Sequence, residues 1–194
     1  MEALKERIRK EGKNLGNGIL KVDSFINHQV DPALMLAAGG ALAAHFGALG
    51  ITKVLTAEIS GIAPALTTAL ALGVPVVYGR KTKPITMPKH VFVQKAPSHT
   101  KDEQVSLMIS PEFLSAADKV LIVDDFLATG YTIMALVRLA QDAGAEVVGV
   151  GAVIEKSFEG GRAKLEAMGL RVRSLAVIAK MTDDDIIFAE GVSP

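Results

Sequence analysis

The residues best suited to chemistry lie in one stretch, residues 120–132. Its first four residues are apolar and predict a buried strand, and two adjacent carboxylates, Asp124 and Asp125, follow at the C-terminal end of that strand. A turn of small residues, 128–132, then leads into a helical pattern. Because the first N–H groups of a helix lack partners and the helix dipole favours negative charge there, this turn is predicted to bind a phosphate.

The residue types within the stretch indicate the class of ligand more closely. Gly130 lets the backbone approach an anion closely, and Thr129 and Thr132 add hydroxyl groups. The two carboxylates would repel a phosphate, so they are better suited to accept hydrogen bonds from vicinal hydroxyls or to lie near a divalent cation. A sugar phosphate satisfies both requirements.

Around this stretch the sequence predicts an α/β fold. From Ile51 onward, short β-branched runs alternate with Ala- and Leu-rich helical patterns, which is typical of a mainly parallel sheet flanked by helices. Ligands of such sheets bind at the carboxyl ends of the strands. Strands are expected at 53–56, 74–78, 120–123, 147–154 and 171–178, and helices at 31–50, 63–72, 132–143 and 162–168.

The chain is expected to form a single domain, 1–194, with two additions to the core. Residues 1–31 or so form an N-terminal helix and a small hood, and residues 80–105 form a flexible loop. Between Arg80 and Lys101 this loop has six Lys or Arg residues and no Asp or Glu. Loops longer than about 12–15 residues in a compact domain are usually functional or disordered, so a functional role is expected for this one.

Composition excludes several classes of protein. The chain has no cysteine, which rules out a disulfide scaffold, a thiolate metal site and a cysteine nucleophile. Its 21 basic residues balance its 21 acidic ones, which argues against a general nucleic-acid binder. The first thirteen residues lack an apolar signal-peptide core, and no run of 18 apolar residues occurs. A cytoplasmic protein without a membrane or nucleic-acid partner is therefore expected.

Residues 120–132 resemble the phosphoribosyl-diphosphate signature of the type I phosphoribosyltransferases, and the order of segments from 51 to 154 resembles their core. The resemblance implies that the catalytic pair Asp124 and Asp125 binds the ribose hydroxyls. It implies that the 5-phosphate is held by Ala128, Thr129, Gly130, Tyr131 and Thr132.

Two further segments match the same family. Residues 56–64 resemble the loop that holds the leaving diphosphate, with Ser60 and Gly61 as the contacts, although a strand-to-helix turn also favours these residues as caps. Arg80, Lys81 and the segment 98–101 resemble a mobile hood that closes over the diphosphate. Mg²⁺ is inferred as a cofactor carried by the substrate, with no metal-ligand set assigned to the protein.

The whole chain is similar to the xanthine-using purine-salvage members of this family, which implies that Leu20, Asn27 and Lys156 bind xanthine. Leu20 would cover the base by apolar contact, Asn27 through its amide, and Lys156 would donate to a carbonyl oxygen. Judged without the resemblance, Lys156 is a surface lysine paired with Glu155 or Glu159. The resemblance also implies a homodimer. Phe158 or Phe126 could stack on the base, although Phe126 is equally suited to the core.

Two alternative functions remain. A guanine- or hypoxanthine-preferring transferase is disfavoured, because those enzymes carry an aspartate near the purine ring at the position of Ala128; the identity of any general base stays open. A non-catalytic regulator that senses phosphoribosyl diphosphate and binds nucleic acid is disfavoured by the zero net charge and by the lack of an added helix-turn-helix region.

Overall fold

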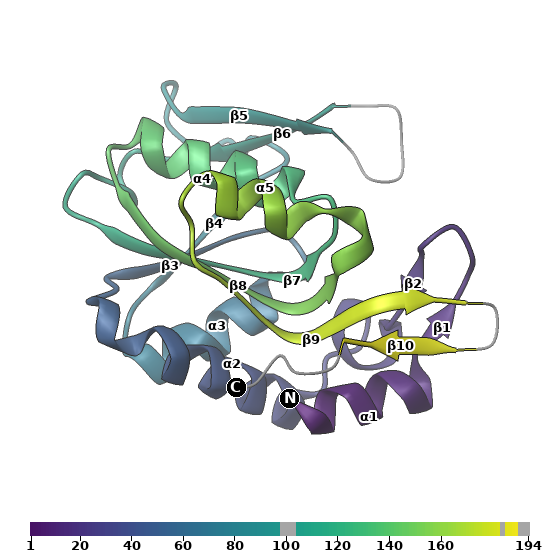
Figure 1. The fold of residues 1–194 in the computed structure, drawn as a ribbon. Coiled ribbons are helices and arrows are strands. Elements are labelled where there is room, and N and C mark those ends of the chain that lie inside the picture. Colours follow the sequence, from purple (N-terminus) through teal and green to yellow (C-terminus); the bar gives the residue numbers. More distant parts are fainter. Residues whose placement is uncertain (98–103, 183–184, 190–194) are drawn as a thin grey trace.

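The computed structural model describes residues 1–97, 104–182 and 185–189. A sheet of six strands lies at its centre (Figure 1). The strand order is β10-β9-β8-β7-β3-β4, and every neighbouring pair is parallel except β9 and β10. The mainly parallel sheet predicted from the sequence is therefore confirmed, with all five expected strands present. The strands are β3 (Lys53–Ala57), β4 (Val76–Gly79), β7 (Lys119–Leu127), β8 (Glu146–Lys156), β9 (Val172–Met181) and β10 (Ile186–Phe188).

Helices cover both faces of the sheet (Figure 1). On one face lie α1 (Glu2–Glu11), α2 (Pro32–Phe46) and α3 (Ile62–Leu72), and on the other lie α4 (Tyr131–Asp142) and α5 (Gly161–Ala167). Successive residues of β7 supply the two resulting cores: Leu121 and Val123 pack with the first set of helices, and Val120 and Ile122 with the second. This alternation follows from the two-residue period of a strand, and it leaves β7 buried on both faces.

Helix α2 begins where its sequence predicts. Asp31 accepts a hydrogen bond from the Leu34 N–H at 3.0 Å, and Pro32 occupies the first helical position. The span Pro32–Leu49, which includes the 3₁₀ turn Gly47–Leu49, is long and apolar enough to cross a membrane by length and composition alone. In the structure Leu42 and Phe46 are buried in the core beneath the sheet.

The N-terminal region adds elements that the sequence did not predict. A small hairpin joins β1 (Lys13–Asn14) to β2 (Leu20–Lys21), and a π-helical segment, Asp23–Asn27, leads toward α2. Phe25 and Ile26 of that segment are buried in the same core as α1 and α2. Packing against the core therefore holds this region in place beside the sheet.

The segment 80–105, predicted as a flexible loop, contains regular structure. Strand β5 (Phe92–Pro97) pairs antiparallel with β6 (Gln104–Ile109), and the Arg80 backbone pairs with Met108. Phe92 and Ala96 face the core shared with α4, so the strand has the expected period of two, which Lys95 and Pro97 obscured in the sequence. The residues expected to form the tip of the hood, 98–101, lie outside the described residues.

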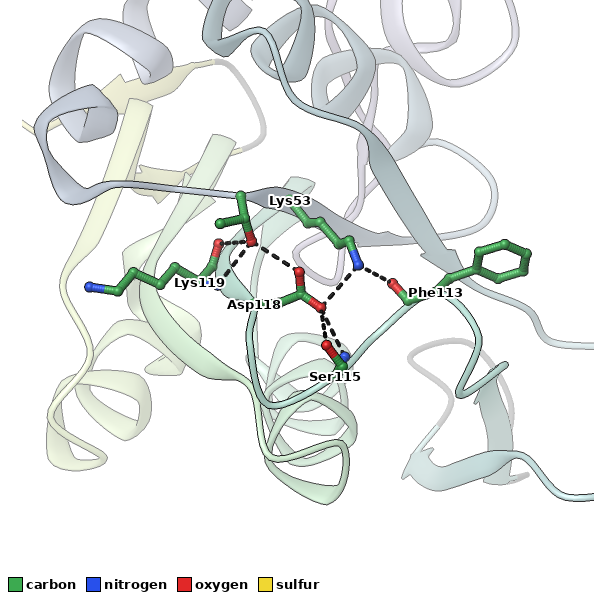
Figure 2. A network of polar contacts seen from close by, with 6 residues as sticks. Lys53, Phe113, Ser115, Asp118 and Lys119 are labelled. Carbon is green, nitrogen blue, oxygen red and sulfur yellow. Dashed lines mark hydrogen bonds and ion pairs between the residues drawn. The ribbon is translucent and has the colours of Figure 1, made fainter.

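A polar network fastens the amino-terminal ends of β3 and β7 (Figure 2). The Asp118 carboxylate accepts hydrogen bonds from Lys53 Nζ at 2.9 Å, Ser115 N at 2.9 Å and Thr52 Oγ1 at 3.1 Å. Lys53 also donates to the Phe113 carbonyl at 2.8 Å. Burial alone would raise the pKa of Asp118, but the hydrogen bonds from Lys53 and Ser115 outweigh it and lower that pKa below its ordinary value.

Asp118→Asn is expected to lower the free energy of unfolding by about 2 kcal/mol at pH 7, the order expected for hydrogen bonds to a charged group. Because the folded pKa is lowered, this stabilisation is present above the unfolded value and is lost as the pH falls through the folded value. Thermal unfolding of both proteins from pH 7 to pH 3 measures it, and the two curves should converge in acid. The exposed pair partner Asp23 gives the control, Asp23→Asn. A pH-independent difference would contradict the assignment.

Candidate active site

A cavity of about 200 Å³ lies at the carboxyl ends of β3 and β7, next to the N-terminus of α4. It is the edge at which ligands of parallel sheets bind. The structure brings to it the predicted phosphate turn, both aspartates and Ser60. The lining residues are Ala57, Glu58, Ser60, Lys81, Asp124, Asp125, Phe126, Ala128, Thr129, Gly130, Tyr131, Thr132 and Ile133.

The phosphate turn connects β7 directly to α4. Gly130 adopts a left-handed conformation (φ 81°) as the residue before the helix, and its carbonyl accepts the Met134 N–H at 2.9 Å. The helix thus begins at Tyr131, with its first N–H groups at the cavity. The structure differs from the sequence prediction in one respect: β7 continues to Leu127, so Asp124 and Asp125 lie within the strand and not beyond its end.

Asp124 and Asp125 are both buried, each 7% exposed, and the Asp125 N–H donates to Asp124 Oδ1 at 3.0 Å. Within the described residues neither carboxylate forms an ion pair. Burial, and then the adjacent negative charge of Asp125, raise the pKa of Asp124 well above its ordinary value. Two carboxylates in this state would be stabilised by hydroxyl donors or by a cation.

Asp124 and Asp125 could supply some, but not all, of the ligands that a Mg²⁺ ion requires. Carboxylate oxygens are suitable ligands, but magnesium requires near-octahedral coordination. The described residues contain no cluster of three or more His, Asp or Glu side chains able to hold a metal ion. The donor set therefore fits an ion that takes most of its ligands from a substrate and water.

The loop after β3 lies directly against Asp124. A Cβ atom at Gly61 would lie 2.5 Å from Asp124 Oδ1 and 2.3 Å from Thr56 Oγ1, so any larger residue would push the loop away. Thr56 is fully buried, and its hydroxyl has no hydrogen-bond partner among the described residues. Gly61 thus allows Ser60 to reach the cavity beside the carboxylates.

Glu58 is a site residue that the sequence reasoning did not single out. Its carboxylate lies 2.8 Å from Arg80 Nε and accepts a hydrogen bond from the Lys81 N–H. These contacts join the end of β3 to the end of β4, and they place Lys81 at the cavity. A charged residue directly after a predicted strand, at the same sheet edge as the aspartates, was the signal that could have identified it.

Lys156 lies at the end of β8 and is only 9% exposed. Its Nζ donates to the Gly18 carbonyl at 2.6 Å, lies 3.5 Å from Glu159 Oε1, and stands 5.3 Å from the centre of the Phe126 ring. The ion pair with Glu159 that the sequence allowed is present, but the lysine is buried and does not belong to the open surface. Glu155 pairs with Arg162 instead, at 2.5 Å.

The three residues expected to bind the base do not line the cavity. Leu20 is buried in the core cluster, and Asn27 is exposed at the end of the π-helical segment. Lys156 is connected to the cavity through Phe126, whose ring it overlies and which lines the wall. The hydrogen bond to Gly18 also brings Lys156 against the N-terminal hairpin, so a base-covering role for this region remains a prediction.

Comparisons with known proteins agree with this geometry. The model of the phosphoribosyl transferase domain matches residues 31–181. The xanthine phosphoribosyltransferases of Leuconostoc mesenteroides and Pseudomonas fluorescens are 50% and 48% identical, covering 97% and 98% of this chain and all of each relative. The solved adenine phosphoribosyltransferase of Rhodothermus marinus is similar with a TM-score of 0.74 at 26% identity, covering 92% of this chain and all of that one.

The chain therefore belongs to the phosphoribosyl transferase family, as the signature in residues 120–132 indicated. It is a glycosyltransferase enzyme with the type I fold of that family. Its cavity brings together the N-terminus of α4 and the buried Asp124–Asp125 pair.

Asp124→Asn is expected to stabilise the fold by about 1 kcal/mol at pH 8, the size of gain seen when a strained functional group is relieved. Because the folded pKa is raised, the folded state binds the proton more tightly, and stability declines as the pH rises from the unfolded value through the folded one. Because the asparagine amide does not titrate, the substitution removes this decline of stability with pH. Thermal unfolding from pH 4 to pH 8 measures it, with Asp142→Asn as the control. Loss of stability at pH 8 would contradict the burial argument.

Proposed function

We propose that the protein transfers the 5-phosphoribosyl group of 5-phospho-α-D-ribose 1-diphosphate to xanthine, giving xanthosine 5′-monophosphate and diphosphate. The observation that carries the proposal is the adjacency, in one cavity, of the α4 N-terminus and the buried Asp124–Asp125 pair. The relatives named xanthine phosphoribosyltransferase support the choice of acceptor, because they match the chain over nearly its whole length.

In this proposal the sugar phosphate spans the cavity. The N–H groups and hydroxyls of residues 128–132 hold the 5-phosphate, and Asp124 and Asp125 accept hydrogen bonds from the ribose hydroxyls. The diphosphate lies toward Ser60 and Gly61, with Lys81 nearby to offset its charge. Each end of the substrate is thereby fixed on a different strand.

The chemical step exchanges one bond at the anomeric carbon for another. The carbon–oxygen bond to the diphosphate breaks, the positive charge that develops on the ribose is stabilised by the nearby carboxylates, and a purine ring nitrogen forms the new bond. The nitrogen passes its proton to water or to the departing diphosphate. Xanthine is itself acidic enough that the chain needs no dedicated base, which is consistent with Ala128 standing where related enzymes carry an acid.

The base is proposed to lie beside Lys156, at the place where this lysine contacts the N-terminal hairpin. An ammonium group has three N–H donors, and among the described residues Gly18 and Glu159 account for two of them. The third is available for a carbonyl oxygen of the base. A pocket that donates hydrogen bonds favours xanthine, with its two carbonyls, over adenine.

The proposal also covers the metal ion, the oligomeric state and the location of the protein. When bound with the substrate, Mg²⁺ would neutralise charge on the leaving diphosphate, and Asp124 or Asp125 could reach it through water. A homodimer is supported by the resemblance and by an apolar groove of about 540 Å³ along β4 that no described residue fills. Tyr78, Met87 and Phe113 form part of its lining, and sedimentation equilibrium measures the oligomeric state. A cytoplasmic location without nucleic-acid binding agrees with the zero net charge, and a mobility shift on RNA or DNA would oppose it.

Diphosphate release is the direct test. With phosphoribosyl diphosphate and magnesium, we expect turnover in the order xanthine before guanine, hypoxanthine and adenine, and none without a base. Asp125→Asn should lower kcat/KM at least about a hundredfold while the protein stays folded, because a hydrogen bond that acts in the transition state is lost. Removing magnesium with a chelator should abolish turnover.

Two results would redirect the assignment. Turnover led by guanine or hypoxanthine would favour the related transferases. Binding of phosphoribosyl diphosphate with no turnover for any base would favour a sensor, and a search for its nucleic-acid target would follow.

Lys156→Ala is expected to change the choice of base. The ratio of kcat/KM for xanthine to that for adenine should fall about tenfold or more, because a carbonyl oxygen loses a charged donor, whereas KM for phosphoribosyl diphosphate should stay nearly constant. Parallel steady-state kinetics with both bases measure the ratio. Lys21→Ala, on the neighbouring β2 surface, is the matched control. Equal losses for all bases would remove the role assigned to Lys156.

A further inference from the structure

The charges lining the cavity leave a problem for phosphate binding. Three acidic residues, Glu58, Asp124 and Asp125, line the cavity, against one basic residue, Lys81. Arg80 balances Glu58, and this pair lies at the ends of β3 and β4, whereas the phosphate turn follows β7. A phosphate at the turn therefore approaches a buried carboxylate pair, so positive charge behind the turn would help to retain it.

Helix α5 supplies such a charge. Lys164 Nζ donates to the Thr129 carbonyl at 3.0 Å and lies 4.2 Å from the centre of the Tyr131 ring. Lys164 is half-buried, and no carboxylate pairs with it among the described residues. Its charge is thus directed at the two residues that flank Gly130.

The same helix holds a second carbonyl of the turn. The Gly161 N–H donates to the Ala128 carbonyl at 3.0 Å. A Cβ atom at Gly161 would lie 2.3 Å from that oxygen and 2.8 Å from Gly130 N, so the close approach depends on glycine. With the Gly130 carbonyl bonded to Met134, the carbonyls of residues 128, 129 and 130 all have partners within the fold. A peptide unit has its C=O and N–H on opposite sides, so fixing the carbonyls fixes where the N–H groups point.

Helix α5 is itself firmly attached to the sheet. Arg162 forms a two-point pair with the buried Glu155 of β8, at 2.8 Å and 2.5 Å, and donates to the Val172 carbonyl of β9 at 3.0 Å. The hydrogen bonds that Arg162 donates to Glu155 outweigh burial and raise the pKa of the Arg162 guanidinium. Lys164, two residues further along, is therefore carried by a rigid support.

We infer that Lys164 is a positioning residue for the 5-phosphate. By donating to the Thr129 carbonyl and lying over the Tyr131 ring, it holds the turn with its N–H groups toward the ligand and adds fixed positive charge behind it. This assigns Tyr131 a role as well, since its ring covers the lysine. The inference rests on the proposed function, because it requires that residues 128–132 hold the phosphate of the substrate.

The test compares binding of ribose 5-phosphate and of ribose to the full chain by titration calorimetry. Lys164→Met keeps the length of the side chain but removes its charge and its donor, and it should weaken ribose 5-phosphate binding about tenfold while leaving ribose binding unchanged. In kinetics, KM for phosphoribosyl diphosphate should rise by a similar factor and KM for xanthine should not. Lys164→Arg, which keeps the charge and a donor, should restore most of the loss.

The matched control is Lys119→Met, at the far end of β7, where Lys119 is half exposed and pairs with Glu146 at 3.6 Å. It should bind both sugars like the wild type. If Lys164→Met binds ribose 5-phosphate as the wild type does, the inference on Lys164 is overturned while the proposed function stands. A lower melting temperature with equal weakening toward both sugars would also overturn it, because it indicates a general structural role. If the wild type does not prefer ribose 5-phosphate to ribose, the proposed function itself fails.

Discussion

The structure depends on holding like charges close together out of water. Asp124 and Asp125 are adjacent, both are buried, and the cavity beside them is suited to an anion. Coulomb repulsion in such a medium is several times stronger than in water, so the site can exist only where the surrounding fold is rigid and its own stability is ample. Central strand β7, covered on both faces and paired on both edges, provides that rigidity.

The elements around β7 each contribute to the site in a different way. The α4 N-terminus presents N–H groups, the loop after β3 reaches Asp124 because residue 61 has no side chain, and α5 holds the carbonyls of the turn. At the β3–β4 end, Glu58 and Arg80 neutralise each other. The site is therefore the product of backbone placement as much as of side-chain type, which is consistent with its location at the carboxyl edge of a parallel sheet.

The sequence alone predicted the sheet, the phosphate turn and the aspartates, because these depend on local patterns: apolar runs, a small-residue turn and the glycines at helix ends. It did not predict the β5–β6 hairpin, since Lys95 and Pro97 on the outer face of β5 concealed the inward-facing positions Phe92 and Ala96. Nor did it identify Glu58 or Lys164. Their contacts with Arg80 and Thr129 join segments 22 and 35 residues apart in the chain, and no local pattern encodes such contacts.

The Asp118 network lies far from the cavity along β7 (Figure 2). It closes the amino-terminal ends of β3 and β7, whereas the aspartate pair occupies the opposite end of β7. The stabilising carboxylate of Asp118 comes just before β7 and the destabilising pair lies toward the other end of that strand, so their effects on the free energy of unfolding should be nearly additive. For protein engineering, the stability that the Asp118 network provides should be retained when substitutions reshape the cavity. For evolution, the acceptor pocket can diverge while the framework that supports it is preserved.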